Sequence, residues 1–169
     1  MKFIVDGMLG KLARWLRMLG HDVIYTRSEE DGNLIRIAET EYRVLLTRDR
    51  KLYKRATSQG VVAVLVIASS RAEKLADLAR RFTFKLEIDT LLSRCPKCNT
   101  ILTPVQKNAV MNRVPGRTYA YYHKFWACPG CKQIYWRGSH WQRIVETLEQ
   151  AKKFSTHLMD AGTKSEKQG

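Results

Sequence analysis

Residues 2–6 read KFIVD, a short apolar run that stops at a carboxylate, and residues 7–20 continue at once with GMLGKLARWLRMLG. In residues 7–20 the apolar side chains fall on one helical face, while Lys11, Arg14 and Arg17 share another. The pattern predicts a strand that ends at an acid and a basic amphipathic helix directly after it. An acid beside a cationic helix suits the binding of a metal ion together with a phosphate group.

The strand-then-helix order continues through residues 1–90. Further strands are predicted at residues 22–26, 43–47 and 61–67, and further helices at 31–41, 49–59 and 71–84. The run at 61–67 is continuously apolar, which is typical of a parallel strand buried on both faces. The alternation predicts an α/β fold in which helices cover a parallel sheet. Right-handed crossovers place the carboxyl ends of the strands at one edge, where open α/β sheets bind ligands.

Three aspartates occupy equivalent positions in these units. Asp6 follows the first strand, Asp31 opens the helix after the second, and Asp49 follows the third. At one edge of the sheet their like charges raise each other's pKa unless a cation lies among them. Mg²⁺ or Mn²⁺ is the expected catalytic occupant, because hard divalent ions prefer oxygen ligands. Helix capping is the alternative role for Asp31 and Asp49, but it explains Asp6, directly behind a buried strand, less well.

Four cysteines form two Cys-x-x-Cys pairs, Cys95 with Cys98 and Cys128 with Cys131. A spacing of two residues lets both thiolates of a pair reach one ion, so the pattern predicts a structural, tetrahedral Zn²⁺ site. Disulfide bonds and a redox pair are the alternatives. A cytoplasmic chain disfavours the first, and the duplication of the pair disfavours the second. The 29 residues between the pairs predict an extended hairpin.

The formal net charge of +14 is unevenly distributed. Residues 1–90 hold 17 Lys and Arg against 12 Asp and Glu, whereas residues 91–169 hold 13 against 4. A merely solubilising surface is one explanation, but so unbalanced a surface also attracts polyanions. Interleaved aromatic residues that can stack on bases favour RNA as the partner, although several of them must form the core of the small cysteine-containing segment.

Basic residues are therefore candidate contacts for substrate phosphates. Near the aspartates in sequence these are Lys11, Arg14, Arg17 and Arg48, and in the cysteine-containing segment they are Arg113 and Arg117. The basic face of the helix at 7–20 is also a candidate contact surface for that segment. No apolar run approaches the ~20 residues that span a bilayer, and an early carboxylate argues against a signal peptide. We therefore expect a cytoplasmic protein that does not bind membranes.

The segments FIVDGMLGKLARWLR (residues 3–17) and LLTRDR (residues 45–50), together with Asp31, resemble the Mut7-C family of PIN-like ribonuclease domains that carry a C-terminal zinc ribbon. The cysteine pairs and YWRGSHW (residues 135–141) also match the family pattern. The resemblance implies a PIN-like fold and metal-dependent endoribonuclease activity, with Asp6, Asp31 and Asp49 in the acidic site. It also makes His140 a candidate substrate contact.

One feature departs from the family pattern, because PIN nucleases commonly offer a fourth acid late in the sheet. This chain has no clear equivalent, and its candidates are Glu73, Asp77, Glu87 and Asp89. A site of three acids holds one metal ion more readily than two, so the resemblance leaves a one-metal or a two-metal mechanism open.

These observations together predict a three-layer PIN-like domain at residues 1–90, a zinc ribbon at 91–138, a C-terminal helix at 139–159 and a disordered tail at 160–169. The leading functional hypothesis is a metal-dependent endoribonuclease whose zinc ribbon helps to bind RNA. The alternative is a non-catalytic RNA- or ribosome-binding protein in which the aspartates bind a structural ion or nothing. An aspartyl phosphatase is disfavoured, because Asp6 lacks the second acid of an Asp-x-Asp motif.

Overall fold

A computed structural model describes residues 1–165, with side chains described for residues 1–156. The chain divides into two compact units. The first consists of residues 1–66 and 88–138, and the second of residues 67–87 together with the chain from residue 139 onward. This grouping by contact does not coincide with the boundaries expected from the sequence, which remain predictions.

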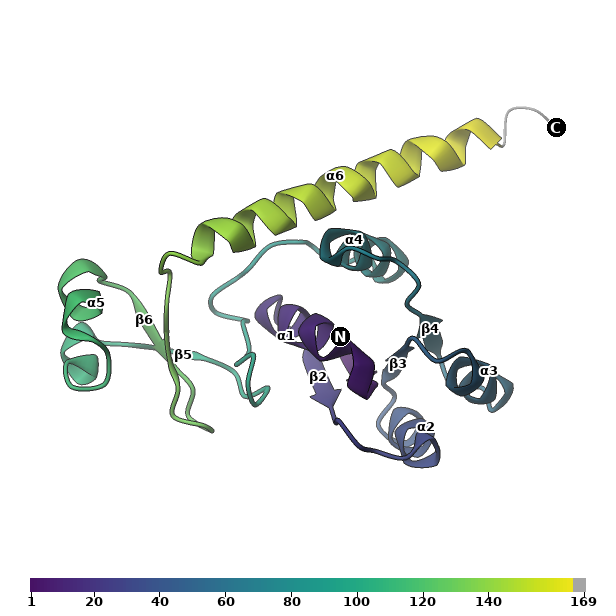
Figure 1. Cartoon of the computed structure of the whole chain (residues 1–169), viewed down its shortest axis with the longest axis horizontal. Coiled ribbons are helices and arrows are strands. Elements are labelled where there is room, and N and C mark those ends of the chain that lie inside the picture. The colour runs from purple at the N-terminus through teal and green to yellow at the C-terminus, as the bar shows by residue number, and fades with distance from the viewer. Residues whose placement is uncertain (166–169) are drawn as a thin grey trace. The chain divides into compact units, whose positions relative to one another are not determined.

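The first unit contains a four-stranded parallel sheet (Figure 1). Its strands are β1 (Lys2–Val5), β2 (Asp22–Tyr25), β3 (Val44–Thr47) and β4 (Ala63–Leu65), in the order β2-β1-β3-β4. Every neighbouring pair is parallel, so all carboxyl ends lie at one edge. The α/β class and the parallel sheet are therefore confirmed.

Helices cover both faces of this sheet. The chain moves from β1 to β2 in one direction and from β2 through β3 to β4 in the other, so right-handed crossovers put the first helix opposite the next two. Accordingly, α1 (Gly10–Met18) lies on one side, and α2 (Asp31–Thr40) and α3 (Arg50–Ser58) lie on the other (Figure 1). Ile4 and Leu45 are fully buried against α2 and α3. The three-layer arrangement is thus confirmed for this unit.

The fourth strand differs from its prediction. β4 covers only three residues of the apolar run at 61–67 and lies at an edge of the sheet. Val62 and Ile67, near the two ends of the run, are strongly exposed. The prediction of a long strand buried on both faces is therefore wrong, because an edge strand needs less cover than a central one.

The cysteine-containing segment forms a second, antiparallel sheet. Its strands are β5 (Thr103–Val105), β6 (Phe125–Ala127) and β7 (Ile134–Trp136), in sequence order. β5 and β6 pair antiparallel, as the expected extended hairpin requires, but two short helices that were not predicted, η2 (Lys107–Val110) and α5 (Gly116–Tyr121), lie between them. Phe125 and Ile134 are buried here with several Tyr and Trp side chains around them. Most of the aromatic residues thus serve the core, because the segment has few other large apolar side chains.

The second unit is a pair of packed helices, α4 (Arg71–Phe82) and α6 (Trp141–Ser165). A capping box starts α4, in which Ser70 Oγ accepts from the backbone N–H of Glu73 and the Glu73 carboxylate accepts from the N–H of Ser70. α6 continues past the expected end at residue 159, so it overlaps the first part of the predicted tail. Residues 166–169 of that tail lie outside the described residues.

Candidate functional site

Asp6 and Asp49 follow the two central strands, and a threonine joins them. Asp6 Oδ2 accepts a hydrogen bond from Thr47 Oγ1 over 2.6 Å, and Thr47 Oγ1 accepts one from the backbone N–H of Asp49 over 2.9 Å. Asp6 is only 9% exposed and Thr47 is fully buried. β1 and β3 are the neighbours at which the winding of the sheet reverses, the place where open α/β sheets bind ligands. The structure therefore links these two acids at the predicted edge.

Both aspartates also accept backbone N–H groups at the start of a helix. Asp6 Oδ1 accepts from Met8 over 2.8 Å and caps the short helix η1 (Gly7–Leu9). Asp49 Oδ1 accepts from Lys51 and Leu52 over 2.6 and 3.1 Å and caps α3. The capping role is thus confirmed for Asp49. Asp6 also caps a helix, because the chain turns into η1 directly after the strand, so capping explains Asp6 better than its position behind a buried strand suggests.

Asp31 has a different environment. It is exposed and is the first residue of α2, while Glu30 occupies the capping position before it. Within residues 1–156, the Asp31 carboxylate takes part in no hydrogen bond or ion pair. The local structure of α2 therefore does not require this carboxylate, which leaves its oxygens available to a ligand.

The proposed fourth acids each have a local partner. Glu73 closes the capping box of α4, and Asp77 pairs with Arg81 over 2.8 Å. Glu87 lies 3.8 Å from Lys152 Nζ, and Asp89 Oδ1 accepts the backbone N–H of Leu91 over 2.8 Å. These contacts explain the four acids without a metal.

The four cysteines converge on one point. Cys95 Sγ lies 3.5 Å from Cys131 Sγ, and Cys98 Sγ lies 3.2 Å from Cys128 Sγ. All four sulfur atoms lie within 4.8 Å of one another. Zn²⁺ bound to four thiolates at about 2.3 Å needs sulfur atoms at about this separation, so the residues fit zinc. Among the residues with described side chains, this is the one group of three or more candidate ligands that meets this spacing. Asp6, Asp31 and Asp49 do not form a second.

The surroundings of the cysteine cluster shift the pKa values of its thiols in opposite directions. The contact between Cys98 Sγ and Thr100 Oγ1, 3.4 Å long, lowers the pKa of Cys98 to about 6. Burial raises the pKa of Tyr135, whose hydroxyl lies 3.1 Å from Cys95 Sγ, so this phenol stays protonated and can donate to a thiolate. Burial has the opposite effect on Cys128 and raises the pKa of this thiol to about 12, so a cation that binds here must itself displace the proton from that sulfur atom.

Arg17 ties the first cysteine pair to the sheet. It is only 7% exposed, and its Nε and Nη2 donate to the Val23 carbonyl over 3.1 and 2.7 Å. Its Nη1 donates to the carbonyls of Pro96 and Lys97 over 3.1 and 3.3 Å. Arg17 is therefore not kept among the substrate contacts, because its guanidinium is occupied and buried. The expected contact between the basic face of α1 and the cysteine-containing segment is present at this residue.

Asn99 makes a second connection that the sequence did not reveal. Its Oδ1 accepts the backbone N–H of Val23 over 3.0 Å, and its Nδ2 donates to Asp22 Oδ1 over 2.7 Å. Asp22 also pairs with Arg43 over 3.1 Å. Burial raises the pKa of Asp22, but hydrogen bonds from Arg43 and Asn99 outweigh it and hold that pKa below its ordinary value. The first cysteine pair is thus fastened to β2 by a charged network.

The other expected phosphate contacts are all exposed. These residues are Lys11, Arg14, Arg48, Arg113, Arg117 and His140. Arg48 lies between Thr47 and Asp49, and Arg113 donates to the Lys132 carbonyl over 2.8 Å. His140 directly precedes α6 and belongs to the second unit, whereas the aspartates belong to the first.

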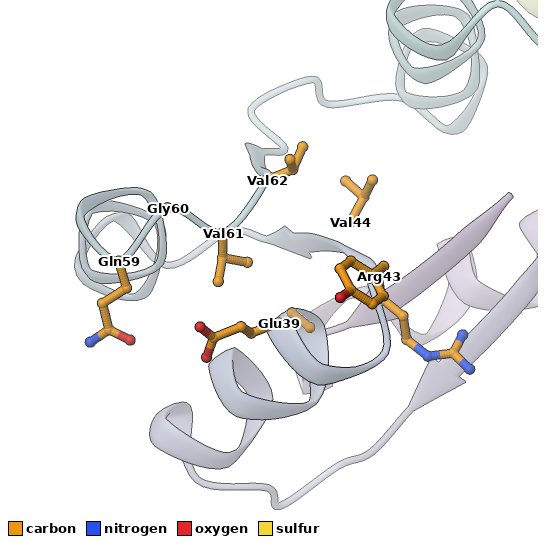
Figure 2. Close-up of a pocket in the computed structure, with 9 residues that line it drawn as sticks. Glu39, Arg43, Val44, Gln59, Gly60, Val61 and Val62 are labelled. Carbon is orange, nitrogen blue, oxygen red and sulfur yellow. The ribbon is translucent and has the colours of Figure 1, made fainter.

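A hollow of about 260 Å³ opens at the other ends of the strands. It lies between the end of α2 and the segment that connects α3 to β4, with Glu39 and Gln59 on its two sides (Figure 2). Val44, which lines the hollow, is the first residue of β3. Asp49 follows the last residue of this strand and so lies at its opposite end. This hollow is therefore separate from the candidate active site.

The functional residue that sequence reasoning missed at the aspartate edge is Thr47. Its position two residues before Asp49, at the end of a buried strand, was the available signal. A threonine in a strand is ordinary, however, and its partner Asp6 is 41 residues away, so the link required the tertiary structure.

The fold and the site define an α/β protein with an acidic edge and a cluster of four cysteines whose geometry fits a metal ion. The Mut7-C RNAse domain family model matches residues 1–148. The chain therefore belongs to the Mut7-C RNAse domain family, and membership implies RNA as the substrate. Searches of curated proteins and of solved structures find no match. Among the described residues, no helix combines the length and the apolar composition needed to cross a membrane.

Proposed function

We propose that this protein is a metal-dependent endoribonuclease that hydrolyses RNA phosphodiester bonds at the edge formed by Asp6, Asp31 and Asp49. The observation that carries the proposal is the hydrogen-bonded connection from Asp6 through Thr47 to Asp49 at the reversal point of the sheet. Family membership supports the reaction class. The four cysteines would hold a structural Zn²⁺, and the basic ribbon would help to bind RNA.

The aspartates suit Mg²⁺ or Mn²⁺ by their chemistry. Carboxylate oxygens are the ligands these ions prefer, and Mg²⁺ is commonly held by one or two carboxylates together with water and substrate phosphates. Asp31 and the Asp49 Oδ2 atom have no partner among residues 1–156 that would have to be displaced. When bound, the cation supplies an activated water and neutralises charge on the phosphodiester.

The chain's own residues position that chemistry. The Thr47 hydroxyl and the Met8 N–H hold the Asp6 carboxylate in one orientation at the end of β1. Two backbone N–H groups at the start of α3 donate to Asp49 Oδ1 and hold the carboxylate in one orientation. The same two contacts therefore fix the position of its other oxygen, Oδ2. Exposed Lys11 and Arg48 would orient the phosphates of the strand by charge.

A non-catalytic RNA-binding protein is the second candidate function. It is favoured by the same contacts read differently, because Asp6 and Asp49 cap helices, a role that needs no metal. The two candidates differ in what they require of Asp31, which has no structural partner among the described side chains.

Asp31→Asn is therefore the sharpest test, because it changes a carboxylate that makes no hydrogen bond or ion pair within residues 1–156. With Mn²⁺ and a single-stranded RNA, we expect this variant and Asp49→Asn to lose about a hundredfold or more in kcat/KM. Glu39→Gln, which removes a carboxylate at the other end of the sheet, is the matched control and should keep the parent's activity. Cleavage that survives EDTA and both aspartate changes would refute the metal mechanism.

A further inference from the structure

A second pocket, of about 460 Å³, lies within the first unit beside the acidic edge. It is bounded by α1, by the end of β2 and the loop after it, and by the first cysteine pair with β7. Its volume falls in the range of sites for small ligands, about 300–1,000 Å³. Among the residues whose side chains are described, no Asp or Glu lines it.

The charge of the pocket is strongly positive. Arg14, Arg27 and Lys97 line it and are exposed, and the buried guanidinium of Arg17 adds a fourth positive charge. Within residues 1–156, Arg14 and Arg27 have no ion pair. Cations that converge from a helix, a loop and a cysteine pair attract an anion more strongly than one exposed Arg does.

Two tyrosines in the lining are held in place by their hydroxyl groups. Tyr25 Oη donates to the carbonyl of Gly7 over 3.1 Å, and Tyr135 Oη lies 3.1 Å from Cys95 Sγ. Gly10 allows the close approach of Tyr25, since a Cβ at this position would lie 2.5 Å from Tyr25 Oη. Fixed aromatic rings can stack on a base with little loss of conformational entropy.

The pocket is connected to the acids along the chain. Gly7, whose carbonyl holds Tyr25, directly follows Asp6. An RNA strand that leaves the aspartate edge on the side of β2 would meet Tyr25 and Arg27 first, and Lys97 of the cysteine pair next.

Neutralisation of the metal centre is the competing role for these cations. Zn²⁺ with four thiolates carries a net charge of −2, and Arg17 lies close enough to Cys95 and Cys98 to interact with them. Arg14 and Arg27 are exposed, and neither makes a hydrogen bond to the cysteine pair, in contrast to Arg17. The competing role therefore accounts for Arg17 better than for the other two.

We propose that this pocket binds one nucleotide of the RNA strand, with its phosphate held by Arg14, Arg27 and Lys97 and its base stacked on Tyr25 or Tyr135. This inference rests on the proposed function, since it takes RNA as the ligand. It adds a specific binding position, on the β2 side of the aspartates, to the general attraction of a basic surface.

Binding of a fluorescein-labelled single-stranded RNA, measured by anisotropy in the Asp49→Asn background, tests the proposal without cleavage. Arg14→Gln with Arg27→Gln should weaken binding about tenfold or more and make the slope of log affinity against log salt shallower by about 0.7 or more. Arg36→Gln with Lys54→Gln, the same charge change on α2 and α3, should have less than a threefold effect, because distant charges are screened by salt.

Tyr25→Leu should weaken binding about tenfold, whereas Tyr25→Phe, which keeps the ring, should retain most of it. The proposal would be overturned if the double change at Arg14 and Arg27 and the control double change at Arg36 and Lys54 weakened RNA binding equally. Loss of zinc from the variant with Arg14→Gln and Arg27→Gln would also overturn it, because the cations would then belong to the metal centre. Displacement of the RNA by AMP at the same concentration as the RNA would overturn it as well, because it would indicate a mononucleotide site. If the parent protein fails to cleave RNA but the changes at Arg14 and Arg27 still weaken RNA binding, the proposed function fails and the pocket assignment stands.

Discussion

The cysteine cluster and the aspartate edge are both candidate metal sites, but they are organised differently. The four sulfur atoms lie within 4.8 Å of one another and have weak hydrogen-bonding partners. The aspartate oxygens do not converge in this way, and the protein's own donors already occupy both oxygens of Asp6 and the Oδ1 atom of Asp49. One site is closed around a point, and the other is open along the edge of a sheet.

This difference agrees with the two kinds of chemistry proposed. In a structural Zn²⁺ site, protein ligands fill all four coordination positions of the ion. The free energy of zinc binding is then part of the folding free energy. A Mg²⁺ or Mn²⁺ site for phosphodiester hydrolysis must leave positions for water and substrate, so fewer protein ligands are appropriate. Four predictions follow. Three of them test this contrast, and the one for His21 concerns a group outside both sites.

Removal of the zinc ligands should have the largest effect. Cys128→Ser, or treatment with a strong chelator, should lower the zinc content from about one ion per chain to near zero and unfold the ribbon, because apparent zinc-binding free energies are about 10 kcal/mol or more. Metal analysis and the fluorescence of Trp126 and Trp136 report the change. A variant that keeps its zinc and its fluorescence would show that the four sulfur atoms are not the metal centre.

Arg17 should come next, because it joins the closed site to the sheet. Arg17→Met leaves the carbonyls of Val23, Pro96 and Lys97 without their donor, at a cost of about 2–4 kcal/mol in the free energy of unfolding. Arg14→Met removes an exposed arginine from the same helix and should change stability by less than about 0.5 kcal/mol. Denaturant unfolding that gives both variants the same midpoint would contradict the role of Arg17.

His21 predicts a pH dependence that involves neither metal site. Burial, with a smaller contribution from the N-terminal ammonium group, lowers the pKa of His21 from 6.5 to about 4. Between these values the unfolded state binds the proton and the folded state does not, so stability is complete above pH 6.5 and falls as the pH drops towards 4. The loss amounts to about 3 kcal/mol at its limit.

Acid also releases zinc from thiolates, so the comparison of interest is between the parent and His21→Gln. We expect the decrease in the free energy of unfolding from pH 6.5 to pH 4.5 to be smaller in the variant. Parallel curves for the two proteins would exclude His21 as the cause.

Thr47 should have the smallest effect on stability and tests the open site. Thr47→Val leaves the buried Asp6 carboxylate without its hydroxyl donor, which should cost about 1–2 kcal/mol and lower kcat about tenfold. Thr47→Ser keeps the hydroxyl and should restore most of the activity. A Val variant that keeps the parent's kcat, or a Ser variant that loses as much as Val, would reduce Thr47 to a packing role.

Much of the fold followed from local patterns. The opening strand, the three helices around residues 10–58 and the cysteine pairs were predicted close to their observed positions, because hydrophobic periodicity and ligand spacing are properties of neighbouring residues. The fourth strand failed as a prediction because edge position depends on strand order. The two helices between β5 and β6 were not predicted, because their residues show no clear helical period.

The sequence by itself determined the α/β class, the four cysteines whose spacing suits a metal ion and the presence of an acid behind the first strand. Only the tertiary structure decided that Arg17 binds carbonyls 79 and 80 residues away instead of phosphate, and that Thr47 joins Asp6 to Asp49. The physical reason is the range of the interactions. A spacing of two residues between cysteines constrains their sulfur atoms directly, whereas the partners of a buried guanidinium or hydroxyl are set by the packing of segments that are distant in the chain.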